Sequence, residues 1–347
     1  MTDDDMLLEA FDARVKRRND RRDFIKNALG AAAIGAGALA FSSEATAQAV
    51  TDADVLNFAL NLEYLEAQFY SYAFSGTGLP DSQLTGVTTQ GARGNVIIGT
   101  TNPARQVNFT GEAAIGQYAR EIAADEIAHV AFLRTALGAS AVAQPTINIS
   151  GDANGPFTAL ANAAGIPLVG GVFDPYASPD NFLLGAFIFE DVGVTAYKGS
   201  SILLTNNTYL DAAAGILAVE AFHSGIIRGS LYRRGLTTPT LRTYADRISD
   251  ARDGADGTTN TPTATPSLYA DDDQGISPMT LSVTTSAGTT TGLASNFVPT
   301  DANGIAYSRT APQVLNVVYL NTAAAAATSG GFFPAGVNGG IRTSAAK

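Results

Sequence analysis

The chain contains two histidines, and each has a glutamate three residues before it. The pairs are Glu126/His129 and Glu220/His223. On a helix, a spacing of three places both side chains on one face, about 5 to 6 Å apart at Cβ, which suits two ligands of one metal ion. Helical pairs of this kind are a component of bundles that bind two metal ions through carboxylates and imidazoles.

Such a bundle also needs one carboxylate from each of its two other helices. The third predicted helix contains a single glutamate, Glu190, which follows the apolar run 183–189. An unpaired carboxylate in these surroundings would be costly to bury, and a metal ion would remove that cost. We therefore predict Glu190 as a ligand.

The first predicted helix offers two glutamates, Glu63 and Glu66, and the spacing of tyrosines distinguishes them. Tyr197 follows Glu190 by seven residues, and Tyr70 follows Glu63 by the same seven. We assign Glu63 as the ligand and Glu66 as a reserve carboxylate or one that contacts the ligands. The tyrosines could donate hydrogen bonds to ligands or carry an electron. An equal alternative is that they only pack, with the hydroxyl reaching solvent.

The same repeat extends to the histidine pairs, because His129 and His223 are each followed by an arginine after five residues and a leucine after eight. The two halves of the pattern therefore look like a duplicated helical hairpin. The arginines, Arg134 and Arg228, are expected to be solvated or paired with acidic neighbours such as Glu121 or Asp125.

Four predicted helices carry these residues. Apolar residues recur with the period of a helix in four segments: 52–74, the residues after Thr110 up to Leu137, about 182–204, and 209–234. Thr51 or Asp52 can cap the first helix. The segment 76–108 is predicted to be a long loop with a short strand at 95–98, and 144–179 to be a connection between the two ends of the bundle.

The order Glu, Glu-x-x-His, Glu, Glu-x-x-His, with a tyrosine two turns after each solitary glutamate, resembles the ferritin-like superfamily. The fold class this implies is mainly α, a ferritin-like four-helix bundle with long loops. More narrowly, the segment 56–70 and the Gly-Gly-Phe-Phe-Pro pattern at 330–334 look like the desiccation-related ferritin-like proteins.

The resemblance implies a role for each ligand and a cofactor of two metal ions. Glu63 and Glu190 would be terminal ligands, Glu126 and Glu220 would bridge, and His129 and His223 would each complete one site. Carboxylates and imidazoles suit Fe or Mn, whereas Zn would fit the ligands without redox chemistry.

The expected domains are the bundle at 48–240 and a low-complexity, partly β appendage at 241–347, packed on the bundle. Within the appendage, 281–285 and 314–320 are β-type runs, and 330–334 could be a docked loop because exposed paired aromatics are unfavourable. The aspartates at 271–273 lack the spacing of a calcium loop and are expected to be solvated.

The N-terminal residues 1–47 have the three parts of a signal peptide. Arg21-Arg22-Asp23-Phe24-Ile25-Lys26 resembles the twin-arginine signal, with Asp20 where Ser or Thr is usual. The resemblance implies the twin-arginine export machinery as a partner and export of the folded protein. Cleavage is expected near Ala47, which leaves a periplasmic or extracellular protein without a stable membrane anchor.

Composition narrows the classes of function. The chain has 347 residues, no cysteine and a net charge of −11, which argues against thiolate chemistry and nucleic-acid binding. Three hypotheses remain: a dimetal oxidoreductase acting on dioxygen or peroxide, a structural or stress-protective protein whose metal ions only hold the bundle together, and a protein that oxidises and stores iron. Storage ranks lower because long loops fit a closed cage poorly. Whether the chain forms a homo-oligomer stays open.

Overall fold

The long helices expected from the hydrophobic pattern are present. The computed structural model describes residues 50–256 and 273–346, so the predicted export signal at 1–47 lies outside the described residues. The expected helices are α2 (Asp52–Ser75), α3 (Ala113–Leu137), α5 (Pro179–Ser201) and α6 (Asn207–Arg234). Each begins and ends within a few residues of its predicted bounds, which confirms the helical assignments.

Local sequence explains where these helices start and stop. The Thr51 side chain accepts a hydrogen bond from the backbone of Asp54, and the Asp54 side chain accepts one from the Thr51 backbone, so α2 begins with a capping box. It ends at Gly76, whose φ of 79° is left-handed. The side chains of Ser178 and Asn206 cap α5 and α6 by accepting a hydrogen bond from a backbone N–H of the first turn.

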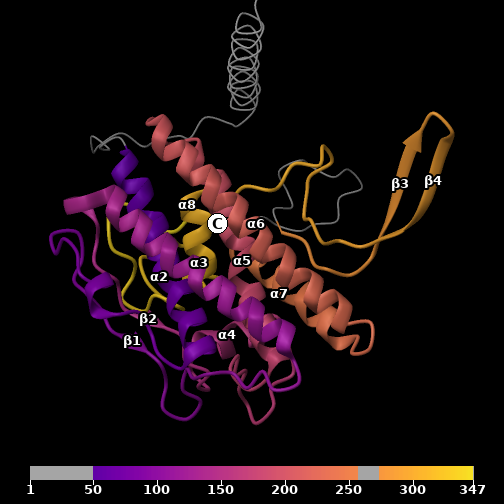
Figure 1. The fold of residues 1–347 in the computed structure, drawn as a ribbon, viewed down its shortest axis with the longest axis horizontal. Coiled ribbons are helices and arrows are strands. Elements are labelled where there is room, and N and C mark those ends of the chain that lie inside the picture. Colours follow the sequence, from indigo (N-terminus) through magenta and orange to yellow (C-terminus); the bar gives the residue numbers. More distant parts are fainter. Residues whose placement is uncertain (1–49, 257–272, 347) are drawn as a thin grey trace, which may run out of the picture. The chain divides into compact units, whose positions relative to one another are not determined.

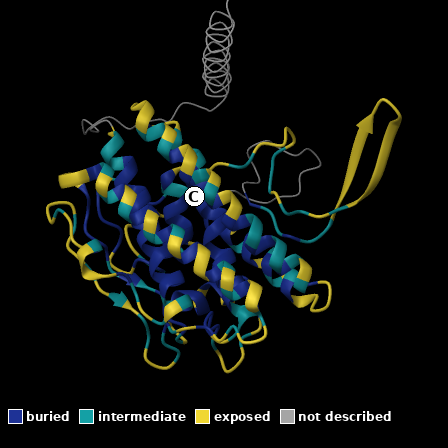
Figure 2. Cartoon of the chain, in the orientation of Figure 1, coloured by how far each residue is buried: buried dark blue, intermediate teal, exposed yellow. Residues whose placement is uncertain are grey.

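The four helices pack as two hairpins, α2 with α3 and α5 with α6, and the hairpins meet through α2 against α5 and α3 against α6 (Figure 1). Every residue of α2 from 55 to 71 and of α5 from 182 to 197 is buried, whereas α3 and α6 expose one side (Figure 2). A helix that is covered on every face needs a second layer around it. That layer comes from the loops and from the segment after α6.

The C-terminal segment contributes two helices to this layer. The helix α7 (Thr240–Asp256) packs on α5 and α6, and α8 (Ala311–Tyr319) packs on α5 and α7. The prediction of a β-type run at 314–320 is wrong, because Thr310 and Gln313 form a capping box that starts a helix. Sequence reasoning also missed α7 and the short helix α4 (Pro156–Ala163), which contacts α7.

The strands in the described residues are short or peripheral. β1 (Val96–Ile97), in the predicted strand segment, pairs in parallel with β2 (Ile147–Asn148). β3 (Met279–Thr285) pairs with β4 (Gly288–Ala294) as an antiparallel hairpin that extends away from the helices, with every residue of β3 exposed (Figure 1). Two 3-10 turns, η1 (Asp81–Gln83) and η2 (Gly138–Ser140), complete the elements.

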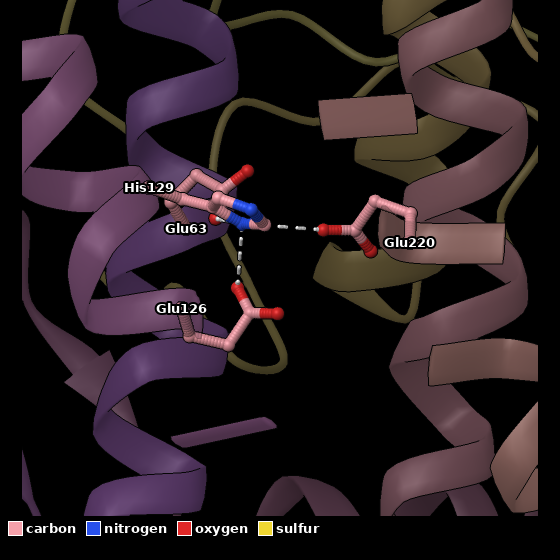
Figure 3. Close-up of side chains that lie close together, drawn as sticks. All are labelled: Glu63, Glu126, His129 and Glu220. Carbon is pink, nitrogen blue, oxygen red and sulfur yellow. Dashed lines mark hydrogen bonds and ion pairs between the residues drawn. The ribbon is translucent and has the colours of Figure 1, made fainter. Parts of the chain in front are cut away.

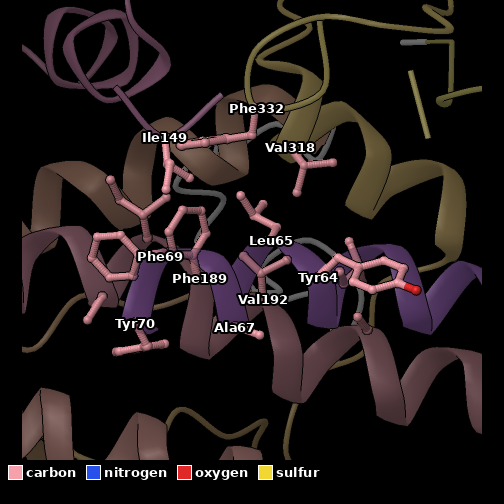
Figure 4. Close-up of a cluster of buried hydrophobic side chains, with 14 of the residues drawn as sticks. Tyr64, Leu65, Ala67, Phe69, Tyr70, Ile149, Phe189, Val192, Val318 and Phe332 are labelled. Carbon is pink, nitrogen blue, oxygen red and sulfur yellow. The ribbon is translucent and has the colours of Figure 1, made fainter. Parts of the chain in front are cut away.

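The loop 330–334 is docked, as its aromatic pair led us to expect. Phe332 and Phe333 are buried, and the Phe332 ring lies 4.9 Å from Phe189 and 5.1 Å from Phe157 between centroids. Figure 4 shows Phe332 beside side chains of α2, α5 and α8. A few residues later, the backbone of Asn338 exchanges two hydrogen bonds with the Asn61 side chain of α2, of 2.8 and 2.9 Å.

Candidate metal centre

The structure brings all six predicted ligands together in the middle of the bundle. Glu63 comes from α2 and Glu190 from α5, while α3 and α6 each supply one helical pair. The side chains form two overlapping clusters in which one ligand atom of each residue lies within 4.8 Å of the others. The six residues are buried, with exposed fractions between 0 and 8%: Glu63, Glu126, His129, Glu190, Glu220 and His223.

The first cluster surrounds His129. Its Nδ1 atom lies 3.1 Å from Glu63 Oε2, 3.6 Å from Glu126 Oε2 and 3.7 Å from Glu220 Oε1. Figure 3 shows the three carboxylates turned toward the imidazole, from helices on both sides of the bundle. Three carboxylates and one imidazole converging on one point form a ligand set that Fe or Mn accepts.

The second cluster surrounds His223. Its Nδ1 atom lies 3.0 Å from Glu126 Oε1 and 3.6 Å from Glu190 Oε2. Glu126 therefore belongs to both clusters and lies between the two imidazoles, whose centroids are 6.4 Å apart. This is the place that a bridging carboxylate would occupy.

The two tyrosines bind carboxylates reciprocally across the helices. The Tyr70 hydroxyl on α2 donates to Glu190 of α5, and the Tyr197 hydroxyl on α5 donates to Glu63 of α2. Seven residues advance about 10 Å along a helix, so this exchange requires α2 and α5 to run antiparallel. The tyrosines are buried, so the alternative in which the hydroxyls reach solvent is wrong.

Sequence reasoning gave no role at this site to Asp125, which the structure places behind His223. Asp125 Oδ2 lies 3.1 Å from His223 Nε2, the ring atom that faces away from the carboxylate cluster. Such a contact fixes the orientation of an imidazole and leaves its other nitrogen free to bind metal. The signal that the sequence offered for Asp125 was its position next to Glu126, a predicted ligand, which could have suggested it as a residue of the site.

Burial changes the protonation of the cluster. Burial raises the pKa of Glu63 to about 7 and that of Glu190 to about 8. Burial also acts on Glu126, but the adjacent His129 and His223 outweigh it and lower the pKa of Glu126 to about 2. Close carboxylates raise the pKa of His129 to about 11, against the effect of burial. In the absence of metal, protons and imidazolium charges balance the carboxylates.

Among the described residues, several of these polar atoms have imidazole–carboxylate contacts of 3.0 to 3.7 Å but no well-formed hydrogen bond. They are both carboxylate oxygens of Glu126 and of Glu220, Oε2 of Glu190 and Nδ1 of His223. Buried polar atoms are rarely left unpaired in folded proteins, and these face one shared space. Cations in that space would satisfy them, so the residues present fit a pair of metal ions.

The two arginines of the repeat do not behave as expected. Arg228 is fully buried, and its guanidinium lies 2.7 Å from Asp191 Oδ2. Arg134 donates to the Tyr64 hydroxyl at 2.6 Å. The expectation of a solvated arginine is therefore wrong for Arg228, and the alternative of a pair with an acidic neighbour holds with Asp191 instead of Glu121 or Asp125. Tyr64 and Asp191 each directly follow a solitary glutamate, so the two hairpins place these arginines in equivalent positions with different partners.

The buried charge around Asp191 extends into the C-terminal segment. Asp191 also pairs with Arg252 of α7 at 2.9 Å, and Arg252 pairs with Asp273 at 2.7 Å. Asp273 in turn lies 3.0 Å from Arg309. The expectation of a solvated aspartate run is thus wrong for Asp273, and 271–272 lie outside the described residues.

Comparisons with known proteins agree with the geometry. A family model described as ferritin-like domain matches residues 51–233. The chain is 26% identical over 270 residues to the desiccation-related protein PCC13-62 of Craterostigma plantagineum, with 76% of each chain covered. It is 28% identical over 300 residues to the ferritin-like catalase Nec2 of Nesocodon mauritianus, with 84% of each chain covered. No solved structure matches the chain significantly.

Proposed function

The chain belongs to the ferritin-like domain family, and we propose that it holds two Fe or Mn ions and uses them to break down hydrogen peroxide. The observation that carries the proposal is the buried set of four glutamates and two histidines, several of whose polar atoms face one space and have no hydrogen bond within the described residues. The similarity to a ferritin-like catalase supports peroxide as the oxidant.

In this proposal each ligand has a defined place. Glu63 and His129 would hold one ion and Glu190 and His223 the other, and Glu126, which belongs to both clusters, would contribute to both. Glu220 Oε1 lies in the His129 cluster, and its second oxygen has no hydrogen-bond partner, so it can also bridge. Tyr70 and Tyr197 hold Glu190 and Glu63 in orientation through their hydroxyl groups.

The reaction we propose is the conversion of two molecules of hydrogen peroxide into two of water and one of dioxygen. One peroxide gains two electrons and two protons and splits at its O–O bond, and the other loses two electrons and two protons. A pair of Fe or Mn ions would supply the two electrons and take them back.

The proposal is tested by metal content and peroxide consumption. Wild-type protein loaded with Fe or Mn should hold about two ions per chain and release dioxygen from peroxide. Glu126→Ala combined with Glu220→Ala should reduce the content toward zero, because it removes Glu126, which both clusters share, and Glu220, which belongs to the His129 cluster. Glu66→Ala should retain both ions. Full metal content in the double variant would refute the site.

A second candidate is a stress-protective protein whose metal only stabilises the bundle, which the similarity to a desiccation-related protein favours. It predicts that metal raises the melting temperature while peroxide is not consumed. Measuring both quantities on the same loaded sample separates the two functions.

We also propose that the protein acts outside the cytoplasm, as the twin-arginine pattern at 20–26 and the small residues before Ala47 favour. N-terminal sequencing of protein from the exported fraction should find a chain that begins at Gln48. A full-length chain in that fraction would contradict cleavage.

A further inference from the structure

A small cavity lies beside the metal centre, between α2, α5, α8 and the docked C-terminal loop. Its volume is about 20 Å³, which is more than the roughly 10–15 Å³ that one water molecule needs and less than two would need. Figure 4 shows part of its wall, including Leu65, Phe189 and Val318. The lining is Leu62, Leu65, Glu66, Ile188, Phe189, Val192, Gly193, Val317, Val318 and Phe332.

Glu66 is the one polar side chain among the described residues that line this cavity. Its exposed fraction is 5%, and in the described part of the chain it takes part in no hydrogen bond. A carboxyl group buried in an apolar wall without a partner is unfavourable. A guest molecule that forms a hydrogen bond with it would relieve that cost.

Gly193 connects the cavity with the metal centre. A Cβ atom at this position would lie 2.3 Å from Glu220 Oε2 and 3.6 Å from Glu66 Oε1. The backbone of Gly193 is not left-handed, so glycine is needed there for space and not for conformation. The gap that it leaves is the point at which Glu66 and the ligand Glu220 approach each other.

We propose that this cavity holds hydrogen peroxide beside the metal centre and that Glu66 accepts a hydrogen bond from it, an inference that rests on the proposed function. Hydrogen peroxide is small, neutral and carries two O–H donors, which matches one carboxyl group in a small apolar space. Dioxygen has no donor, and an alkyl hydroperoxide is too large for the walls.

The assignment also explains what the C-terminal segment contributes to the site. Val317 and Val318 of α8, together with Phe332, form the side of the cavity that faces away from the bundle. None of them belongs to the four ligand helices. The segment after α6 therefore closes the substrate space and determines its size.

The first experiment compares Glu66→Leu, which keeps the volume but not the carboxyl group, with Glu66→Gln, which keeps hydrogen bonding. Loss of the hydrogen bond to the buried carboxyl group should raise KM for peroxide about 2- to 10-fold in Glu66→Leu, with two ions per chain and kcat retained. Glu66→Gln should recover most of the affinity. Glu121→Gln, an exposed position on α3, is the matched control and should leave KM unchanged.

A second measurement does not depend on turnover. Zn²⁺ accepts the same ligands without redox chemistry, so crystals of the Zn-loaded protein can be soaked with hydrogen peroxide. Density for peroxide within hydrogen-bond distance of Glu66 is expected in the wild type and not in Glu66→Leu. In Fe- or Mn-loaded protein, Val318→Ala should enlarge the cavity and raise the rate with tert-butyl hydroperoxide relative to hydrogen peroxide.

An unchanged KM in Glu66→Leu would overturn the inference, as would loss of metal from that variant, because Glu66 would then be a ligand. Water alone in the soaked cavity would overturn it as well. If peroxide occupies the cavity but wild-type protein loaded with Fe or Mn does not consume it, the proposed function fails while the cavity assignment stands.

Discussion

Removing the carboxylate of Asp191 should destabilise the protein strongly. Asp191 has an exposed fraction of 4% and accepts hydrogen bonds from Ser224 at 2.6 Å, Arg228 at 2.7 Å and Arg252 at 2.9 Å. Both arginines are almost completely buried. Asp191→Ala therefore removes the shared partner of two buried cations.

The magnitude follows from what the arginines retain. Arg228 keeps hydrogen bonds to backbone carbonyls, among them that of Gly275 at 2.7 Å, and Arg252 keeps its pair with Asp273. Breaking one side of a buried ion pair typically costs about 3–5 kcal/mol. For a domain of this size, each 1 kcal/mol lowers the melting temperature by about 2–4 °C, so a decrease of about 6–20 °C is expected.

The assay is thermal unfolding of the metal-free mature chain, followed by circular dichroism at one pH. Asp81→Ala is the control, because Asp81 pairs with Arg93 at the surface, with exposed side-chain fractions of 86% and 40%. That change should cost less than about 1 kcal/mol. Equal decreases in melting temperature for Asp191→Ala and Asp81→Ala would refute the reasoning, because the cost of losing an aspartate would then not depend on its burial.

Two further predictions concern the metal centre. Tyr70→Phe and Tyr197→Phe should each weaken metal binding about 10- to 100-fold without abolishing it, because the proposed ligands Glu190 and Glu63 lose an orienting hydrogen bond. Metal-competition titrations would measure this, with Tyr232→Phe as an unaffected control. The second concerns pH: burial raises the pKa of Glu63 to about 7 and of Glu190 to about 8, from an ordinary 4.5. A carboxyl group whose pKa is raised in the folded protein stabilises the fold at pH values below its unfolded-state pKa. This stability is lost as the pH rises through the folded-state pKa, so metal-free protein should melt at a lower temperature at pH 8 than at pH 5. Bound metal replaces these protons and should abolish the decline; a melting temperature of metal-free protein that rises over this interval would contradict the argument.

The ligand helices were predictable because their signals are local. A glutamate three residues before each histidine shares its helical face whatever the rest of the chain does. The seven-residue offset of Tyr70 and Tyr197 pointed to Glu63 ahead of Glu66 for the same reason. The structure places Glu63 in the His129 cluster and Glu66 in the wall of a cavity.

The partner of each tyrosine could not be read from spacing. A tyrosine seven residues along a helix is about 10 Å from its own glutamate, so its hydroxyl must reach a different helix. Only the antiparallel packing of α2 against α5 determines that Tyr70 meets Glu190 and Tyr197 meets Glu63. The β-type prediction at 314–320 failed because its valines suit a strand or a buried helix equally, and the capping residues Thr310 and Gln313 start a helix there.

By itself, the sequence determined the helical bundle and the six residues that converge in it, because periodicity and i, i+3 spacing act within one helix. Tertiary structure decided which charges are buried. From the sequence, Arg228 and Asp273 look like surface residues. In the structure, Asp191 and backbone carbonyls of the C-terminal segment surround Arg228, and Arg252 and Arg309 surround Asp273. Burial of a charge depends on partners far along the chain, and only the packed fold brings them within hydrogen-bond distance.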